Sequence, residues 1–144
     1  MTAPSDTSIF EATYPVSFGD CDPAGIVFYP NMFAWLDRTF HAYLLAKADG
    51  HPAVSKALGV RGIGLKSAHC DFRSPVAECD DLVVAIRAIE YNPRDFRVIY
   101  QGLIGERLAF EGYEDRALFI FQEGRIRAGD PALLRDHLAS FSAN

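Results

Sequence analysis

The stretch "NMFAWLDRTFHAYLLAKADG", residues 31–50, decides the fold, because its apolar side chains recur at the spacing of an α-helix. The stripe consists of Phe33, Leu36, Phe40, Tyr43 and Leu44, and Met32 and Trp35 widen it. Pro30 suits the first turn of such a helix, where a backbone N–H would have no intrahelical partner, and Gly50 followed by Pro52 marks its end. The pattern predicts a long helix that is buried on most sides.

The segments around this helix have the pattern of strands. Tyr14, Val16 and Phe18 alternate within residues 10–18, which is the period of a half-buried strand. After a short helical turn at residues 53–58, further strands are expected within residues 62–76, 80–92, 96–105 and 108–122. Short connections favour antiparallel neighbours, and a short helix capped by Asp130 should end the chain. The prediction is an α+β fold with one antiparallel sheet packed on one buried helix.

Length and composition limit the class of protein. The 144 residues, 49% hydrophobic and 23% charged, predict a single folded domain over residues 1–144. A net charge of −5 with scattered basic residues argues against a nucleic-acid partner. The start of the chain is neither basic nor apolar and no window is long enough to span a membrane, so we expect a cytoplasmic protein without a membrane partner. Strand edges left uncovered by one helix predict a homo-oligomer.

Cysteine and histidine give little sign of chemistry. The three cysteines form no CxxC pair, which argues against a disulfide framework or a zinc site. Cys21 lies between Asp20 and Asp22, whose negative charges should raise its pKa and keep the thiol protonated and inert. The histidines stand apart in the sequence, at His41, His51, His69 and His137. We therefore expect no metal site.

The stretch "FGDCDPAGIVFYPN", residues 18–31, holds the best candidate for catalysis. Asp22 begins an Asp-Pro turn, and it could simply accept backbone N–H bonds there. Alternatively, its carboxylate lies close to free backbone N–H groups, because the glycine-containing loop after it runs into a helix start. That arrangement pairs a nucleophile or base with an oxyanion site, the two parts that acyl transfer requires. The spacing alone leaves both interpretations open.

The longer stretch "FGDCDPAGIVFYPNMFAWLDRTF", residues 18–40, resembles the signature of the 4-hydroxybenzoyl-CoA thioesterase family, which has the form DxDPAGIVxYPNxxxWxD. The rest of the chain agrees with that family in length and in the order of elements. The resemblance implies a hotdog fold, in which a five-stranded antiparallel sheet wraps a long central helix. It also implies homodimers or homotetramers with active sites at subunit interfaces, and an acyl-CoA substrate with no separate cofactor.

The resemblance also assigns residue roles. Asp22 corresponds to the catalytic carboxylate, either as the nucleophile on the thioester carbonyl or as a general base for water. The backbone N–H of Tyr29 corresponds to the donor that polarises this carbonyl, and Gly25 lets the loop pass close to the substrate. Ser74 is the nearest match to a hydroxyl from the partner subunit, with a simple turn role as the alternative. Pro30 stands where a related group of short-chain thioesterases has histidine, so a histidine-assisted route is not expected.

The substrate is predicted from the same resemblance. Arginine or lysine should hold the phosphates of CoA, and our candidates are Arg94 and Arg97. Phe28 offers surface for an aromatic acyl group, so 4-hydroxybenzoyl-CoA or benzoyl-CoA is the first choice. The alternatives are a short- or medium-chain aliphatic acyl-CoA thioesterase, a module that binds acyl-CoA or acyl-carrier protein without cleavage, and a dehydratase that uses His69 near Asp71.

Overall fold

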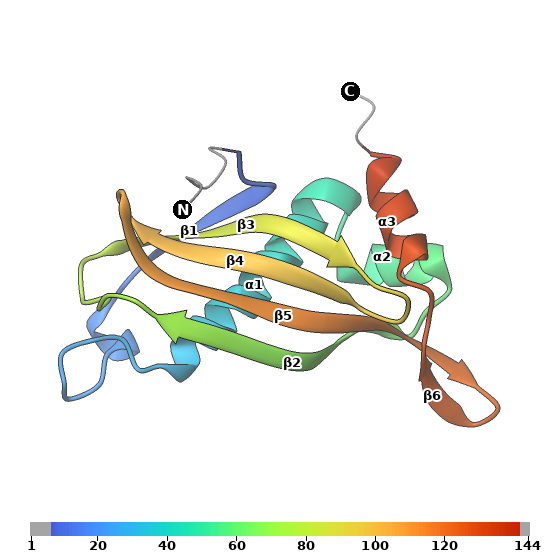
Figure 1. Cartoon of the computed structure of the whole chain (residues 1–144), viewed down its shortest axis with the longest axis horizontal. Helices are drawn as coiled ribbons and strands as arrows, with labels where there is room; N and C mark the ends of the chain where they lie inside the picture. The colour runs from blue at the N-terminus through green and yellow to red at the C-terminus, as the bar shows by residue number, and fades with distance from the viewer. Residues whose placement is uncertain (1–6, 142–144) are drawn as a thin grey trace.

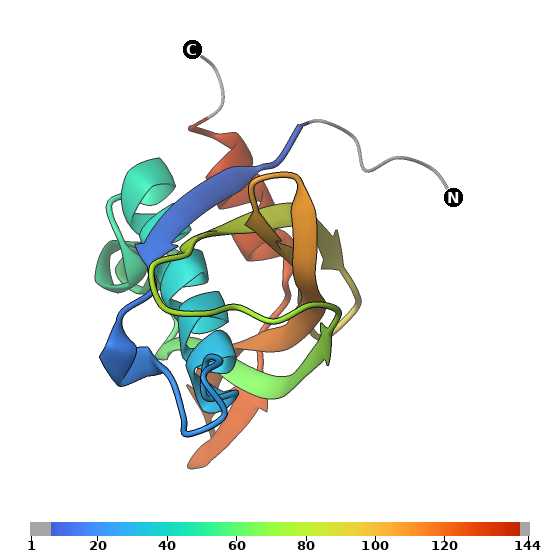
Figure 2. The same cartoon turned by 90° about the vertical axis from the view of Figure 1, so that its left-hand side faces the viewer.

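The predicted long helix is α1 (Pro30–Ala48), and a curled antiparallel sheet wraps around it (Figure 1, Figure 2). The computed structural model describes residues 7–141 of the chain. Two shorter helices, α2 (His51–Leu58) and α3 (Ala132–Ala139), pack near the end of α1. α1 ends where Asp49 and Gly50 take positive φ angles of 65° and 101°, which is how a left-handed turn closes a helix.

The sheet contains the predicted strands in a non-sequential order. Its strands are β1 (Phe10–Pro15), β2 (Gly62–Phe72), β3 (Asp81–Tyr91), β4 (Phe96–Ile104) and β5 (Arg107–Gln122). They lie in the order β1-β3-β4-β5-β2, and each neighbouring pair is antiparallel. Strands β1 and β2 are therefore the two edges of this path. The fold is the α+β hotdog that the sequence predicted.

Two local features differ from the prediction. The first strand ends at Pro15, and residues 18–20 form a short 3-10 helix, η1 (Phe18–Asp20), that leaves the Phe18 side chain 79% exposed. A sixth strand, β6 (Arg125–Ala128), pairs with the end of β5 and extends the sheet beyond the five strands expected. Its turn uses Glu123 and Gly124, both with positive φ, as in the tight turns that match strand twist.

One apolar core lies between α1 and the inner face of the sheet. It brings together Leu36, Phe40 and Leu44 of α1, Leu82, Val84 and Ile86 of β3, and Phe96, Val98 and Tyr100 of β4. Burial alternates along β4, as the period of a strand with one covered face requires. In the described part of the chain, no helix is long and apolar enough to cross a membrane.

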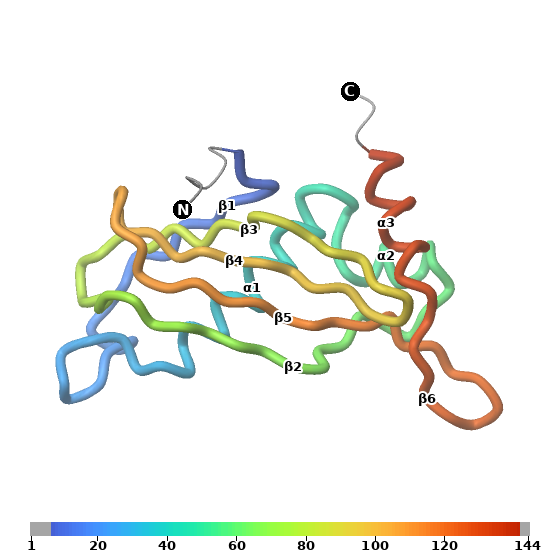
Figure 3. The backbone as a smooth tube through the Cα atoms, in the orientation of Figure 1, coloured from blue at the N-terminus to red at the C-terminus, as the bar shows by residue number. Residues whose placement is uncertain are grey.

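The strand register decides which loops share an end of the sheet. The end of β1 lies opposite the start of β3, and the end of β2 lies opposite the start of β5. The β1–α1 loop, the β2–β3 connection and the β4–β5 turn therefore gather at one end (Figure 1, Figure 3). The β3–β4 turn, residues 92–95, lies at the opposite end. The β1–α1 loop is the stretch that carries the predicted catalytic residues.

Candidate active site

The two aspartates of the β1–α1 loop have different tasks. The Asp20 Oδ2 atom accepts hydrogen bonds from the Ser17 N–H at 2.9 Å and from the Ser17 hydroxyl at 3.2 Å, and so closes the short 3-10 helix. The Asp20 carbonyl oxygen accepts from the Phe28 N–H and from the Asn31 side-chain amide, both at 2.9 Å. Asp20 therefore ties the loop to the start of α1 and is a structural residue.

Asp22 belongs to a turn but keeps one carboxylate oxygen available. Its Oδ1 accepts from the Ala24 N–H at 2.9 Å, and its carbonyl oxygen accepts from the Gly25 N–H at 2.9 Å. The Asp22 N–H donates to the Ile26 carbonyl at 3.0 Å. Among residues 7–141 the Oδ2 atom of this half-buried side chain has no hydrogen-bond partner. The turn thus fixes the carboxylate and leaves an oxygen for chemistry, so the two interpretations of Asp22 are compatible.

Gly25 is required by the backbone of this turn. Its φ of 80° lies in the left-handed region, which side chains with a Cβ rarely adopt. A Cβ built on Gly25 meets no atom within 4 Å. Within one chain, Gly25 is therefore needed for the conformation of the turn and not for close packing. Its predicted proximity to the substrate stays a prediction.

The start of α1 offers one free donor. Pro30 has no N–H, while the N–H groups of Asn31 and Met32 donate to the carbonyl oxygens of Phe28 and Tyr29 at 3.0 and 3.1 Å. The N–H of Tyr29 has no acceptor within the described part of the chain. It lies at the positive end of the helix dipole, where an oxyanion is stabilised. The sequence analysis predicted this N–H as the donor to a thioester carbonyl, and that role stays a prediction.

A cavity of about 350 Å³ lies between this loop and the segment that follows β2. Its lining consists of Ile26, Val27, Tyr29 and Met32 on one side and Phe72, Arg73, Ser74, Pro75 and Val76 on the other. The two sides are joined by a hydrogen bond of 2.8 Å from the Val27 N–H to the Val76 carbonyl. The cavity is mostly apolar, as pockets for organic acyl groups are. The predicted Phe28 lies outside this lining, 48% exposed and 5.5 Å from the Tyr29 ring.

Ser74 lines the cavity, but its hydroxyl proton is already used. The Oγ atom donates to the Leu108 carbonyl at 2.8 Å and accepts from the Arg107 Nη1 at 2.7 Å. A hydroxyl has a single proton, so in this arrangement Ser74 has none to give a substrate. The contacts of Ser74 within its own chain therefore favour the turn role that the sequence analysis kept as the alternative.

The two predicted CoA-binding arginines lie at the far end of the sheet within one chain. Arg94 is exposed in the β3–β4 turn. Arg97 forms a bidentate ion pair with Asp115, with Nε to Oδ1 at 2.8 Å and Nη2 to Oδ2 at 3.0 Å, and its guanidinium lies 3.7 Å from the Tyr113 ring centroid. Hydrogen bonding to Asp115 raises the pKa of Arg97. Arg97 thus already has a carboxylate partner.

Two other arginines stand at the end of the sheet that carries the loop. Arg73 lines the cavity, and Arg107 begins β5 directly after the β4–β5 turn. Sequence reasoning missed both. Arg107 pairs with Ile104 across the β4–β5 turn. Its position beside the β2–β3 connection follows from the order of the strands, which the sequence did not reveal.

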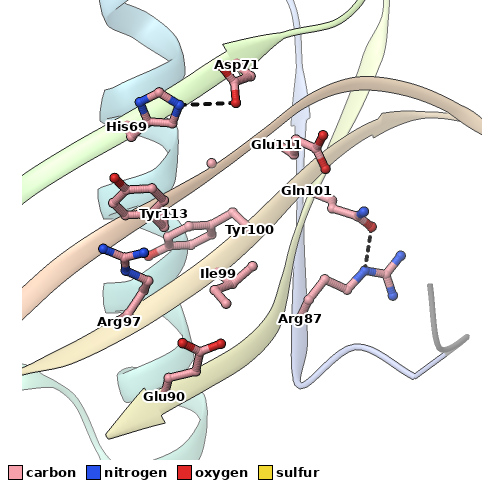
Figure 4. A pocket seen from close by; sticks show the side chains of 11 residues that line it. His69, Asp71, Arg87, Glu90, Arg97, Ile99, Tyr100, Gln101, Glu111 and Tyr113 are labelled. Atoms are coloured by element: carbon pink, nitrogen blue, oxygen red, sulfur yellow. Dashed lines mark hydrogen bonds and ion pairs between the residues drawn. The ribbon is translucent and has the colours of Figure 1, made fainter. Parts of the chain in front are cut away.

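The His69 and Asp71 pair lies in a second hollow, of about 450 Å³, on the outer face of the sheet. Their side chains are 3.1 Å apart, and the His69 ring stacks on Tyr113 (Figure 4). Figure 4 shows α1 behind the sheet, so this pair is on the face away from the helix. The histidine and acid of the dehydratase alternative are therefore separated from the free Tyr29 N–H.

Cys21 has the properties of an inert thiol. Burial raises its pKa, and the negative charges of Glu78, Asp20 and Asp22 raise it further. The effect of the two aspartates was predicted, and Glu78 is added by the β2–β3 connection. No group of three metal-ligating side chains gathers anywhere in residues 7–141.

The comparisons with known proteins agree with the fold. The model of the Thioesterase-like superfamily matches residues 16–140. In the solved structure of 4-hydroxybenzoyl-CoA thioesterase from Pseudomonas sp. strain CBS-3, 99% of that chain superposes on 92% of this one with 26% identity and a TM-score of 0.74. A 1,4-dihydroxy-2-naphthoyl-CoA thioesterase from Synechocystis has a TM-score of 0.76 at 18% identity, over 94% of this chain and 98% of that one.

A curated relative extends the comparison. The 1,4-dihydroxy-2-naphthoyl-CoA hydrolase of Prochlorococcus marinus is 31% identical over 100 residues, which are 65% of this chain and 66% of that protein. The match thus covers slightly less than two thirds of the hydrolase. The fold is that of the hotdog thioesterases. The chain belongs to the Thioesterase-like superfamily.

Proposed function

We propose that this protein hydrolyses the thioester of an aromatic acyl-CoA to the free acid and CoA. The observation that carries the proposal is the free Oδ2 of Asp22 and the unbonded N–H of Tyr29, held in one short loop beside a mostly apolar cavity. A thioester carbonyl that accepts from the Tyr29 N–H would be polarised at its carbon. Asp22 then either attacks this carbon, forming an anhydride that water cleaves, or removes a proton from an attacking water. In both routes the CoA thiolate leaves and no further cofactor takes part.

The size and lining of the cavity favour a planar acyl group. A volume of about 350 Å³ is at the lower end of the range for small-molecule pockets. Its wall of Ile26, Val27, Met32 and Phe72 offers apolar surface for a ring. The relatives are named for 4-hydroxybenzoyl-CoA and 1,4-dihydroxy-2-naphthoyl-CoA, which both carry hydroxylated aromatic acyl groups. We propose the same class of substrate here, without choosing between one ring and two.

The open edge of β2 supports the proposal that the protein acts as a homodimer. β2 pairs only with β5 among the described strands, so one edge of this 11-residue strand has no neighbouring strand, although the Ile63 N–H at its start donates to the His51 Nε2 at 3.0 Å. Its Leu65 and Phe72 side chains are 49% and 51% exposed. A second copy of β2 could pair along this edge, since unpaired backbone groups are a template for another strand. Such a copy would also cover Phe72 and complete the wall of the cavity.

Thiol release from a panel of acyl-CoAs tests the proposed reaction. The panel should contain 4-hydroxybenzoyl-CoA, benzoyl-CoA, 1,4-dihydroxy-2-naphthoyl-CoA and short aliphatic acyl-CoAs. We expect release to concentrate on the aromatic members, and we expect Asp22→Asn to lower kcat by about 10²–10⁴-fold. Asp136→Asn, on an exposed aspartate of α3, is the matched control and should keep the wild-type rate.

Three results would oppose the proposal. Binding of acyl-CoA without thiol release would support a binding module. Release from aliphatic members only would leave the hydrolase but change the acyl group. An Asp22→Asn variant with the wild-type rate would remove Asp22 from the mechanism.

A further inference from the structure

We propose that Arg107 is a positioning residue of this site, which holds the cavity wall at residues 74–76 and, through it, the catalytic loop. This inference rests on the proposed function. Arg107 is not part of the loop; it reaches the site from the start of β5 and lies 85 positions after Asp22 in the sequence. Its role follows from three sets of contacts.

The first set is made by the guanidinium. The Nη1 atom donates to the Ser74 Oγ at 2.7 Å and to the Pro75 carbonyl at 2.8 Å. The Nη2 atom lies 3.9 Å from the Asp80 Oδ2, at the outer limit of an ion pair. One side chain thus contacts three residues of the β2–β3 connection. Arginine suits this task because its planar fork holds several acceptors in a fixed geometry, which the single ammonium of lysine does not.

The second set joins this wall to the catalytic loop. Val76 follows Pro75 directly, is 1% exposed, and accepts the Val27 N–H at 2.8 Å through its carbonyl. Val27 is itself 5% exposed and lies two positions before Tyr29. The preceding residue, Ile26, accepts the N–H of Asp22 at 3.0 Å. A shift of the wall therefore moves both parts of the proposed catalytic pair.

The third set shows why the middle of the wall depends on Arg107. The start of the connection is tied to β5, because the N–H groups of Arg73 and Ser74 both donate to the Ala109 carbonyl, at 2.8 and 3.0 Å. The end is tied to Val16, the residue directly after β1, by the Cys79 N–H, which donates to the Val16 carbonyl at 2.9 Å. Between these ties Pro75 has no N–H to donate. Loss of Arg107 should therefore loosen the wall and leave the sheet pairing in place.

The Arg107→Gln substitution tests this role, with Arg135→Gln as the control. Arg135 is an exposed arginine of α3 that contacts Asp136 at 3.1 Å, away from the cavity. In Arg107→Gln we expect kcat to fall roughly 10- to 100-fold, because a displacement of about 1 Å at reacting groups has that effect. KM should change much less than kcat. The amide proton of Val27 should exchange faster with solvent, since its acceptor is no longer held.

A second substrate separates positioning from phosphate binding. An aromatic acyl thioester of N-acetylcysteamine carries the same reacting bond but none of the phosphates of CoA. A positioning role predicts the same loss of kcat for this thioester as for the acyl-CoA. A rise in KM that occurs with the acyl-CoA and is absent with the truncated thioester would make Arg107 a phosphate-binding residue and overturn the proposal.

Amide exchange keeps the inference independent of the proposed reaction. If wild-type protein releases no thiol from any substrate, the proposed function fails, and the exchange rate of Val27 alone then decides whether Arg107 holds the wall. Unchanged exchange at Val27 in Arg107→Gln overturns the inference in every case. Should that variant fail to fold, Arg107→Lys carries the same comparison, because it keeps the charge and removes the fork.

Discussion

The substitution Arg116→Met should lower the free energy of unfolding, because it removes the cation of a buried charge cluster that joins α1 to the sheet. Arg116 is 1% exposed and donates to the Glu114 Oε1 at 2.9 and 3.1 Å and to the Asp37 Oδ1 at 2.7 Å. Glu114 is also 1% exposed, and its other partner is the Tyr100 hydroxyl. Methionine would keep part of the packing on Phe40, over which the guanidinium lies at 4.5 Å. It would leave the Glu114 carboxylate buried without a cation.

The expected loss is about 3–5 kcal/mol of the free energy of unfolding, which is typical when one partner of a buried ion pair is removed. For a chain of this length, that loss corresponds to a fall in Tm of roughly 10–20 °C. An exposed pair provides the contrast. Arg135→Met breaks the contact with Asp136 on α3 and should cost less than about 1 kcal/mol.

The loss should also depend on pH, with a sign set by Glu114. Burial raises the pKa of Glu114, and the charge of Arg116 only partly opposes it. Without Arg116 the pKa rises further, so the folded variant binds a proton that the unfolded chain releases above about pH 4.3. Stability of Arg116→Met is then greatest at low pH and falls as the pH rises through the raised pKa. The wild-type protein should show a weaker dependence of this kind.

Urea denaturation at pH 5 and pH 8, at a fixed protein concentration, measures both effects. A loss below about 1 kcal/mol at pH 8, or the same loss at both pH values, would show that Glu114 is not left as a buried charge. The double variant Glu114→Met with Arg116→Met removes both charges, and it should recover much of the stability, as replacement of a buried pair by apolar residues does.

Three further predictions concern the loop and α2. Tyr29→Phe should keep kcat within about threefold in the thiol-release assay, because the backbone N–H is the proposed donor and the side chain is 60% exposed. Gly25→Ala should cost roughly 1–2 kcal/mol in urea denaturation, because its φ of 80° is left-handed. Burial, the neighbouring His41 and Arg116 lower the pKa of His51, whose Nε2 accepts the Ile63 N–H at 3.0 Å. Stability should therefore fall as the pH drops below about 6.5 and through this lowered pKa, and His51→Asn should flatten the dependence in a pH series of Tm.

Much of the fold could be predicted because its signals are local. The apolar spacing of α1 and the alternation along the strands depend on neighbours within one element. The prediction of the first strand ran past its actual end at Pro15, also because of a local contact. Phe18 continues the alternation, but Asp20 captures the N–H and hydroxyl of Ser17 and turns the chain. The spacing of apolar residues carries no information about such side-chain hydrogen bonds, so it could not predict where the strand ends.

The missed sixth strand had a weak signal in the sequence. Glu123 and Gly124 form a two-residue turn with positive φ at both positions. Glycine is common at the second of these positions, whereas glutamate is uncommon at the first, where Asn or Asp is preferred. The strand that follows is exposed along its whole length, so it lacks the alternation that would have identified it.

In the candidate site, too, local contacts could be predicted from the sequence and distant contacts could not. Asp22, Gly25 and Tyr29 lie within eight consecutive positions, and the turn and the free N–H were expected from that short stretch, whereas the positive φ of Gly25 was not. The surroundings of the arginines depend on strand register. Arg97 is opposite Asp115 on the neighbouring strand, and Arg107 reaches Ser74 across 33 positions of sequence. Neither contact could be assigned before the order of the strands was known.

Two aspartates within the stretch of residues 18–40, Asp22 and Asp37, have different tasks. Asp22, in its first half, is held by backbone N–H groups that leave one oxygen free. Asp37, in its second half, lies on α1 and accepts from the buried Arg116, so that it fixes the helix to β5. Tyr29 directly precedes this helix, so its N–H lies at the positive end of the helix dipole. Asp37 therefore holds α1 against the sheet about two helical turns from the Tyr29 N–H, the donor on which the proposed reaction depends.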